Sequence, residues 1–229
     1  MIMTDTSSFS SEYEQRLKAV WGSFRIPPRL AHASFENYQP TCPEQERALQ
    51  KCRTFAKNGL ENIARGHGLF FQGPCGTGKS HLCVAALRAI VENDIERFGR
   101  PAGEHGFVGE PVYAGCYCLV VSVVDLLSLL RESFNAERLR NSARRLLHRC
   151  RSDALVILDD IGAEKPTDWV EEQLYAIIDV RYRMQRSTFF TTNCSMKQLE
   201  AQIGSRSVSR IMEMCAGVRV GGDDWRKRF

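Results

Sequence analysis

A glycine-rich loop between an apolar run and a helical pattern constrains this chain more than any other feature. Residues 73–80 fit the pattern G-x-x-x-x-G-K-[ST], and the apolar residues 69–71 precede them. Glycines let the backbone N–H groups of such a loop approach phosphate oxygens, and the following helix presents its positive N-terminus to the same oxygens. The pattern predicts that Lys79 reaches the β- and γ-phosphates and that the Ser80 hydroxyl ligates Mg²⁺. We therefore expect ATP or GTP to bind at Gly73, Pro74, Cys75, Gly76, Thr77, Gly78, Lys79 and Ser80.

Short apolar runs alternate with helical patterns from residue 68 onward. The runs expected to form strands are 69–71, 116–121, 155–158 and 187–192, with a weaker one at 218–220. Helices are expected over 79–92, 125–134, 137–151 and 169–184, and before the loop over 43–65. Asp168 and Glu171 have the spacing of a capping box for the helix over 169–184. Strands that are apolar on both faces and alternate with helices predict an α/β fold with a parallel sheet.

The chain divides into a short N-terminal segment and one larger unit. With 229 residues, of which 43% are hydrophobic, it is long enough for one globular core. Apolar residues recur at helical spacing between positions 13 and 24, until prolines at 27 and 28 end the pattern. We expect residues 1–27 to form a tail and an amphipathic helix, and residues 28–229 to form the nucleotide-binding domain. The helix either packs on that domain or docks on a partner.

The sequence gives no indication of a membrane span or a secretory signal. The longest apolar stretch, 116–130, is interrupted by polar residues, and the first 15 residues lack a basic segment followed by an apolar one. The nine cysteines are odd in number and include no Cys-x-x-Cys pair. A zinc site at Cys116 and Cys118 would need a second pair, which the chain does not offer. We expect reduced thiols, no structural zinc and a cytoplasmic protein.

Polar side chains follow two of the expected strands. Asp159 and Asp160 come directly after the apolar run 155–158, and parallel sheets bind ligands at the carboxyl ends of their strands. Asp159 would hold Mg²⁺, largely through water, and Asp160 would orient or deprotonate the attacking water. Asn193 follows the run 187–192. It could hydrogen-bond the γ-phosphate and the attacking water if its strand lies between the strand before the glycine loop and the strand before the acid pair. The alternatives are a solvated acidic turn and an ordinary asparagine turn.

Arginines form a second group of candidates. Arg206 and Arg210 lie one helical turn apart, and an arginine from a neighbouring subunit can stabilise the charge that develops in phosphoryl transfer. The alternative is a pair of surface arginines. Arg226 is a weaker phosphate-reaching candidate. Between residues 137 and 151 six arginines and one acid sum to +5, whereas the whole chain carries only +4.

Taken together, these motifs resemble the AAA+ ATPases of the DnaC/IstB group, which includes bacterial helicase loaders and transposition helper ATPases. Residues 73–82 resemble the Walker A motif of the group, 155–165 its Walker B motif, 189–193 its sensor 1, 205–215 its arginine-finger box and 221–226 its sensor-2-like end. The resemblance implies a P-loop NTPase three-layer sandwich with a sheet of order 5-1-4-3-2 and a largely absent lid, since only 19 residues follow Arg210.

The resemblance also implies ligands and partners. They are ATP with Mg²⁺, a replicative DNA helicase, single-stranded DNA and further copies of the chain, which would associate in an ATP-dependent way. Arg210 would be the finger that acts on the neighbouring subunit, Arg206 its companion, and His81 and Arg226 would lie at the nucleotide. The DNA-contacting insertion of the group falls where the basic segment stands, so its candidates are Phe134, Arg138, Arg140, Arg144 and Arg145. A solvated basic helix face is the alternative for these residues.

Several departures keep other functions open. Asp160 stands where many AAA+ proteins have Glu, which suggests slow hydrolysis, and the glycine-rich stretch 98–115 has no counterpart in the group. A transposition helper ATPase would fit the same motifs, and a nucleotide-gated binding module with little turnover would fit Asp160. A P-loop kinase would need an arginine-bearing lid over its acceptor and would turn over as a monomer, and the sequence offers no such lid.

Overall fold

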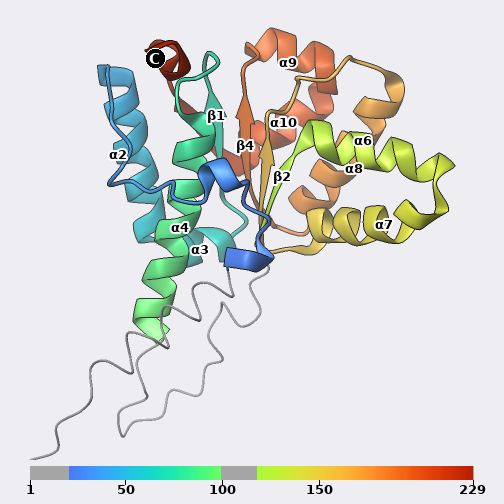
Figure 1. The fold of residues 1–229 in the computed structure, drawn as a ribbon, viewed down its shortest axis with the longest axis horizontal. Coiled ribbons are helices and arrows are strands. Elements are labelled where there is room, and N and C mark those ends of the chain that lie inside the picture. The colour runs from blue at the N-terminus through green and yellow to red at the C-terminus, as the bar shows by residue number, and fades with distance from the viewer. Residues whose placement is uncertain (1–20, 99–117, 229) are drawn as a thin grey trace, which may run out of the picture.

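A five-stranded parallel sheet forms the centre of the molecule (Figure 1). The computed structural model describes residues 21–98 and 118–228. From one edge to the other the strands are β2 (Cys118–Ser122), β3 (Leu155–Asp159), β4 (Ser187–Thr192), β1 (Gly68–Gln72) and β5 (Cys215–Arg219). This is the predicted order 5-1-4-3-2, and it confirms that the strand before Asn193 lies between the strand before the glycine loop and the strand before the acid pair.

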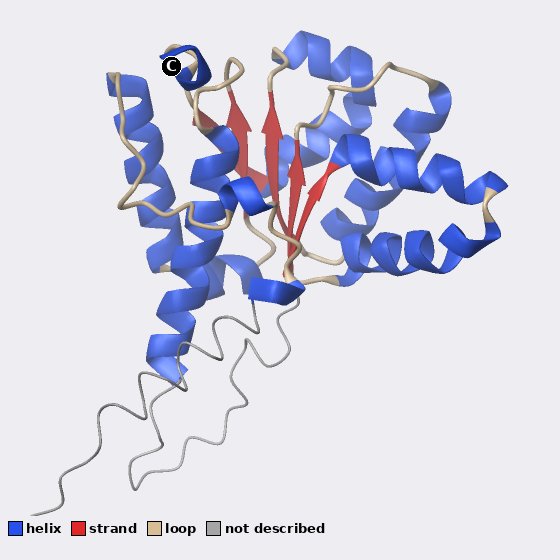
Figure 2. Cartoon of the chain, viewed as in Figure 1, coloured by secondary structure: helices blue, strands red, loops and turns tan. Residues whose placement is uncertain are grey.

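Helices cover both faces of the sheet, which gives three layers (Figure 2). Successive side chains of a strand point to opposite faces, so Leu69 and Phe71 belong to one core and Phe70 to the other. The first core is closed by α2 (Pro43–Lys57), α3 (Gly59–Ala64), α4 (Lys79–Phe98) and the residues before them. The second is closed by α6 (Val123–Asn135), α7 (Glu137–Ser152), α8 (Asp168–Arg183), α9 (Met196–Ile203) and α10 (Ser205–Met214).

Several predicted element boundaries differ from the structure, and the helix expected over 79–92 runs to Phe98. Three further differences have identifiable reasons. The helix over 43–65 is two helices, because the chain bends at Asn58 and Gly59 approaches Ile90 of α4 so closely that a Cβ there would lie 2.4 Å from it. The capping box at Asp168 is absent, because Thr167 is the N-cap and its side chain accepts a hydrogen bond from the Val170 N–H. The last strand begins at 215 rather than 218, since an edge strand with one exposed side needs no continuous apolar run.

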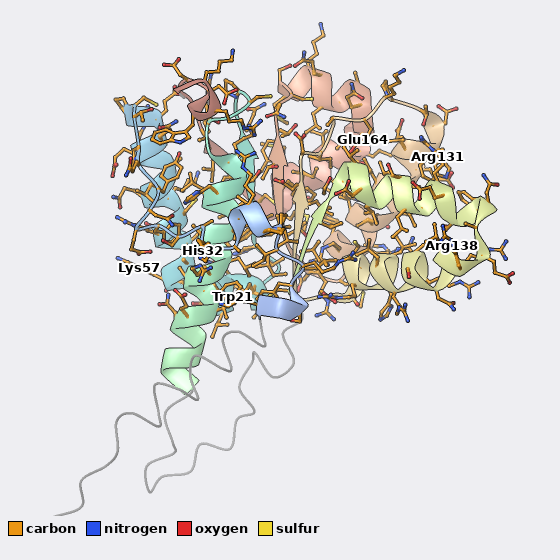
Figure 3. All side chains as sticks on the ribbon, viewed as in Figure 1. Trp21, His32, Lys57, Arg131, Arg138 and Glu164 are labelled. Carbon is orange, nitrogen blue, oxygen red and sulfur yellow. The ribbon has the colours of Figure 1, made fainter. Side chains whose placement is uncertain are left out.

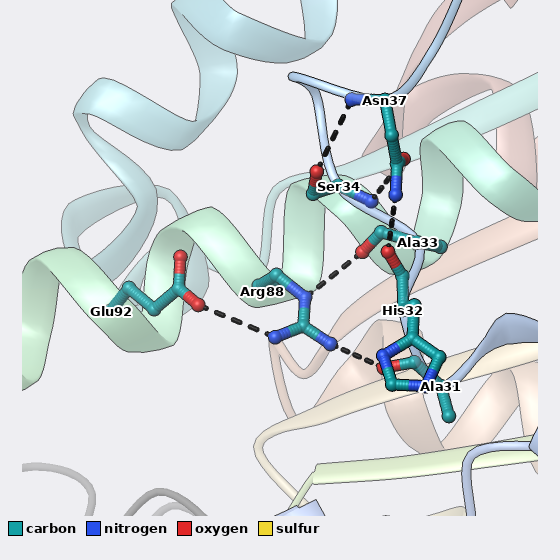
Figure 4. Close-up of polar contacts among 7 residues, drawn as sticks. All are labelled: Ala31, His32, Ala33, Ser34, Asn37, Arg88 and Glu92. Atoms are coloured by element: carbon teal, nitrogen blue, oxygen red, sulfur yellow. Dashed lines mark hydrogen bonds and ion pairs between the residues drawn. The ribbon is translucent and has the colours of Figure 1, made fainter. Parts of the chain in front are cut away.

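The N-terminal part of the described chain crosses the sheet and is fixed to it. Phe24 is 2% exposed, and its carbonyl accepts a hydrogen bond from the Val120 N–H of β2. Further along, Arg88 of α4 donates to the carbonyls of Ala31 and Ala33 (Figure 4). The segment therefore lies against α4 next to the glycine loop. Most of the amphipathic helix expected before Phe24, together with the glycine-rich stretch and Cys116, lies outside the described residues.

The described residues also include two short 3-10 helices, η1 (Pro28–Leu30) before α2 and η2 (Trp225–Arg228) after β5. After β5 the described residues form a turn and η2. Within 21–98 and 118–228, each helix is too short or too polar to cross a bilayer.

Candidate functional site

The glycine loop, the acid pair and Asn193 meet at the carboxyl ends of β1, β3 and β4. They border a cleft of about 670 Å³. Of the residues predicted for the nucleotide site, those that line the cleft are Cys75, Gly76, Thr77, Gly78, Lys79, Ser80, His81, Asp159, Asp160, Asn193 and Arg226. Gly73 and Pro74 complete the loop behind Lys79. The structure thus brings together the predicted residues of four separate sequence segments.

The loop conformation requires its glycines. Gly76 and Gly78 have φ values of +73° and +92°, in the left-handed region that favours glycine. A Cβ at Gly76 would lie 1.6 Å from a carboxylate oxygen of Asp224, and one at Gly78 would lie 2.6 Å from the ring of Tyr38. The loop is therefore packed between the C-terminal segment and the N-terminal segment.

Lys79 connects the loop to the end of β4. Its Nζ donates hydrogen bonds to the carbonyls of Gly73 (2.8 Å) and Pro74 (2.6 Å) and to Oδ1 of Asn193 (2.6 Å). The side chain is 7% exposed, and this burial lowers the pKa of Lys79, while the carboxylate of Asp160 acts in the opposite direction. An ammonium group held among oxygens at the base of a glycine loop is well placed to receive phosphate oxygens.

Ser80 and Asp159 form a second polar contact at the floor of the cleft. The Ser80 hydroxyl donates to Oδ1 of Asp159 (2.8 Å), and the Thr191 hydroxyl donates to the same oxygen (2.6 Å). Hydroxyl and carboxylate oxygens are the protein ligands that Mg²⁺ prefers. The side chains present therefore fit a magnesium ion bound between α4 and β3.

Asp160 is held in an unusual conformation. Its φ is +60°, which costs a non-glycine residue on the order of 1 kcal/mol and is typical of functional sites. Its N–H donates to the Thr191 hydroxyl (2.8 Å), and its Oδ1 accepts from Nδ2 of Asn193 (2.6 Å). Burial, and then the charge of Asp159, raise the pKa of Asp160, which makes its carboxylate a better proton acceptor.

The structure adds residues that the sequence patterns did not indicate. Tyr38 Oη (3.2 Å) and Gln45 Nε2 (3.4 Å) both donate to the Thr77 carbonyl at the turn of the loop. Gln45 also donates to the Gly221 carbonyl (3.0 Å) and accepts from the Thr41 N–H (2.7 Å). Gln45 is separated from Thr77 by 32 positions and from Gly221 by 176, so no local pattern could have identified these two contacts.

His81 and Arg226 both line the cleft. The His81 ring lies 5.4 Å from that of Tyr38, and its Nε2 is 3.0 Å from the Ser34 carbonyl. Arg226 belongs to η2, and the N–H of its neighbour Trp225 donates to the Gly76 carbonyl (3.1 Å). The C-terminal segment therefore reaches the loop by backbone contacts, and the charged group of Arg226 lies at the cleft.

Arg206 and Arg210 lie away from the cleft, on α10, which packs on α8 on the other side of the sheet. Arg210 pairs with Asp179 of α8 at 3.0 Å, whereas Arg206 is exposed. The structure therefore does not place either arginine at the nucleotide site of its own chain.

The basic segment forms a helical hairpin with α6, and Figure 3 labels Arg131 and Arg138 on it. Phe134 is 64% exposed and makes an edge contact with Trp169 (6.3 Å), over which the Arg131 guanidinium lies at 5.1 Å. Trp169 and Arg131 were not predicted. The four candidate arginines on α7 are exposed, namely Arg138, Arg140, Arg144 and Arg145.

A parallel sheet of this order, with a glycine loop after β1 and an acid pair after β3, defines an AAA+ P-loop NTPase. The family model described as "IstB-like ATP binding protein" matches residues 106–229, which is more than half of the chain. The chain belongs to this family of ATP-binding proteins.

Individual relatives and structures agree with this assignment. The "Replicative helicase loader DnaC" of Escherichia coli (strain K12) is 26% identical over 221 residues, which cover 95% of this chain and 77% of DnaC. The "Crystal structure of the DnaC helicase loader" is 29% identical with a TM-score of 0.66, over 85% of this chain and 99% of that one. The crystal structure of DnaI (19% identical, TM-score 0.66, 90% and 98% covered) shares the fold.

Proposed function

We propose that this protein is a DnaC-like helicase loader of the cytoplasm that binds single-stranded DNA and hydrolyses ATP at the interfaces between its copies. The similarity to helicase loaders over 95% of the chain supports the class of function. The observation that carries the ATPase proposal is the chain of hydrogen bonds from Lys79 through Asn193 to Asp160. We assign residues 28–229 to the ATPase domain and residues 1–27 to partner docking, with Phe24 as the point of attachment to the core.

Each polar group of the cleft has a role in this proposal. The backbone N–H groups of residues 73–78 and the Lys79 ammonium would bind the phosphates of ATP. Ser80 and Asp159 would hold Mg²⁺, which neutralises phosphate charge when it is bound. Asp160 would orient the attacking water and accept its proton, and Asn193 fixes the carboxylate for this task. The position of the Lys79 ammonium at the base of the loop and the hydrogen bond from Asn193 to Asp160 support these assignments.

The remaining charge stabilisation would come from a second copy of the chain. Arg210 is the arginine that the arginine-finger box indicates, and it lies on the opposite side of the sheet from α4. It would therefore act on the ATP of a neighbour, with Arg206 beside it. ATP would then bridge two copies of the chain, and hydrolysis would separate them and release the partner.

Two substitutions test the division of roles between the subunits. Lys79→Ala should abolish nucleotide binding, because it removes the only ammonium seen among the cleft-lining residues of the described chain. Arg210→Ala should leave nucleotide binding unchanged and lower the assembly-dependent turnover on the order of 10³-fold. Fluorescent-nucleotide titration and phosphate release at increasing protein concentration measure the two quantities. Equal loss of binding in both variants would contradict the proposal.

The partner separates a helicase loader from a transposition helper ATPase. The name of the family whose model matches residues 106–229 favours the second function as the alternative. The purified replicative helicase of the host, tested for co-precipitation with and without ATP, should be retained in an ATP-dependent way. Retention of a transposase instead of the helicase would support the alternative.

A further inference from the structure

The guanidinium of Arg210 is held by side chains of α8. Its Nε donates a hydrogen bond to Oδ1 of Asp179 (3.1 Å), and Nη2 forms an ion pair with the same oxygen (3.0 Å). Nη2 also donates to the Tyr175 hydroxyl (3.2 Å), and Nη1 donates to the Arg206 carbonyl (3.1 Å). Every nitrogen of the group thus has a partner, which fixes both its position and the plane of its fork.

Two tyrosine rings complete the surroundings of this group. The guanidinium carbon lies 5.0 Å from the centre of the Tyr175 ring and 5.4 Å from that of Tyr182. The Tyr182 hydroxyl donates in turn to Oε2 of Glu213 on α10 (2.9 Å). Both rings belong to α8 and restrict the guanidinium from that helix, and such cation–π contacts favour its charged form.

The carboxylate that holds Arg210 is itself oriented. Oδ2 of Asp179 accepts a hydrogen bond from Nε of Arg183 (2.8 Å). This hydrogen bond, and then the charges of Arg183 and Arg210, lower the pKa of Asp179, so the carboxylate stays ionised. One oxygen of Asp179 thus faces Arg210 and the other faces solvent-exposed Arg183.

The second arginine of α10 provides the contrast. Arg206 is exposed, and within the described part of the chain its side chain makes no hydrogen bond or ion pair. An arginine side chain loses rotamer freedom when its fork is fixed on an anion, and less is lost if it is already fixed. Of the two candidates, Arg210 has the side chain that is fixed before any neighbour arrives.

We infer that Asp179, together with Tyr175 and Tyr182, is a positioning residue that presets Arg210 for the ATP of a neighbouring subunit. The inference rests on the proposed function. The side chains that hold Arg210 lie on α8, which follows Asp160 after a connection of seven residues, 161–167.

The experiment is a double-mutant cycle on assembly-dependent ATP turnover. Asp179→Ala should lower the maximal turnover about tenfold and leave nucleotide affinity unchanged. In an Arg210→Ala background the same substitution should change single-turnover hydrolysis less than twofold, because Asp179 acts through Arg210. Asp179→Asn keeps an acceptor oxygen and should restore most of the rate, which also covers the case in which the alanine variant fails to fold.

Glu172→Ala is the matched control, since it removes an exposed carboxylate of the same helix that does not contact Arg210 in the described structure, and it should keep turnover within twofold. Equal losses from Asp179→Ala with and without Arg210 would show a merely structural role and would overturn the inference. A rise in turnover would also overturn it, because Asp179 would then restrain the finger. If Arg210→Ala alone leaves turnover intact, it is the proposed function that fails.

Discussion

A single hydroxyl, that of Thr191, sets the positions of both acids in the cleft. It donates to Oδ1 of Asp159 and accepts the N–H of Asp160, so it joins the magnesium candidate to the residue with the left-handed backbone. Thr191 is buried at the end of β4, where a valine would have almost the same shape. Its contribution is therefore the hydrogen bonds rather than the packing.

Thr191→Val should weaken the binding of Mg²⁺ in the presence of nucleotide about tenfold. Hydrogen bonds to charged groups are worth about 1.5–3 kcal/mol, and this substitution removes one from Asp159. Nucleotide affinity in EDTA should stay unchanged, since no phosphate-binding group is altered. Titration of Mg²⁺ against a bound fluorescent nucleotide measures the effect.

The neighbouring Thr192→Val serves as its control. Thr192 is equally buried, but its hydroxyl donates to the Ile161 carbonyl and not to either acid. Its Mg²⁺ midpoint should match that of the unaltered protein. A Thr191→Val variant with the same midpoint would remove the role assigned to that hydroxyl.

At the scale of elements, the α6–α7 hairpin carries charge on its surface and, near the end of α6, the exposed ring of Phe134, which contacts Trp169 of α8. The six arginines counted from the sequence do not act alike. Four are exposed, whereas Arg149 turns inward to pair with buried Asp153 and to donate to the Ser23 and Cys118 carbonyls. The exposed arginines, with Phe134 and Trp169, combine the two features that single-stranded nucleic acid requires, a cationic track and stacking platforms.

Trp169→Ala and Phe134→Ala should each weaken single-stranded DNA binding about tenfold, because base–aromatic stacking is worth about 1–3 kcal/mol per base. The salt dependence should stay unchanged in these variants. Arg144→Ala should instead reduce the slope of log affinity against log salt by about 0.7. Fluorescence anisotropy with a labelled oligonucleotide at several salt concentrations measures both.

Met184→Ala is the control for these variants, since Met184 is 61% exposed at the end of α8. It should bind DNA like the unaltered protein. If Trp169→Ala binds equally well at every salt concentration, the hairpin is only a solvated basic surface.

Elements with a strong local pattern could be predicted from the sequence, and those defined by tertiary contacts could not. The strand 187–192 was predicted to the residue, because its apolar and β-branched run is continuous. The interruption at Gly59 follows from its contact with α4, which cannot be read from neighbouring residues. The start of α8 depends on a local choice between two adjacent cap candidates, and Thr167 rather than Asp168 is the N-cap.

At the scale of the whole molecule, the same distinction applies to the site. The motifs predicted which residues meet in the cleft, because each follows a parallel strand and the carboxyl ends of such strands share one edge. The segment that holds the glycine loop through Tyr38 and Gln45 has no motif and comes from a distant part of the chain. These contacts with the glycine loop form only when the distant segments are brought together by folding.

At the opposite ends of the strands, where β4 begins, a buried charged side chain holds several elements together. Arg181 of α8 has no exposed surface, and it donates to the carbonyls of Cys150 and Asp153 at the end of α7 and to the Ser187 carbonyl and Thr188 hydroxyl of β4. Burial lowers the pKa of Arg181 to about 10, so it remains charged at neutral pH. One side chain therefore joins α7, α8 and β4.

Arg181→Met should lower the free energy of unfolding by about 3 kcal/mol, because it leaves three buried carbonyls without these donors. Nucleotide affinity of the folded protein should not change, since the cleft lies at the other ends of the strands. Urea denaturation gives the first quantity and nucleotide titration the second. Arg65→Ala, which removes an exposed ion pair with Glu61, should change the free energy of unfolding by less than about 0.5 kcal/mol. An Arg181→Met variant as stable as this control would show that packing alone holds the three elements together.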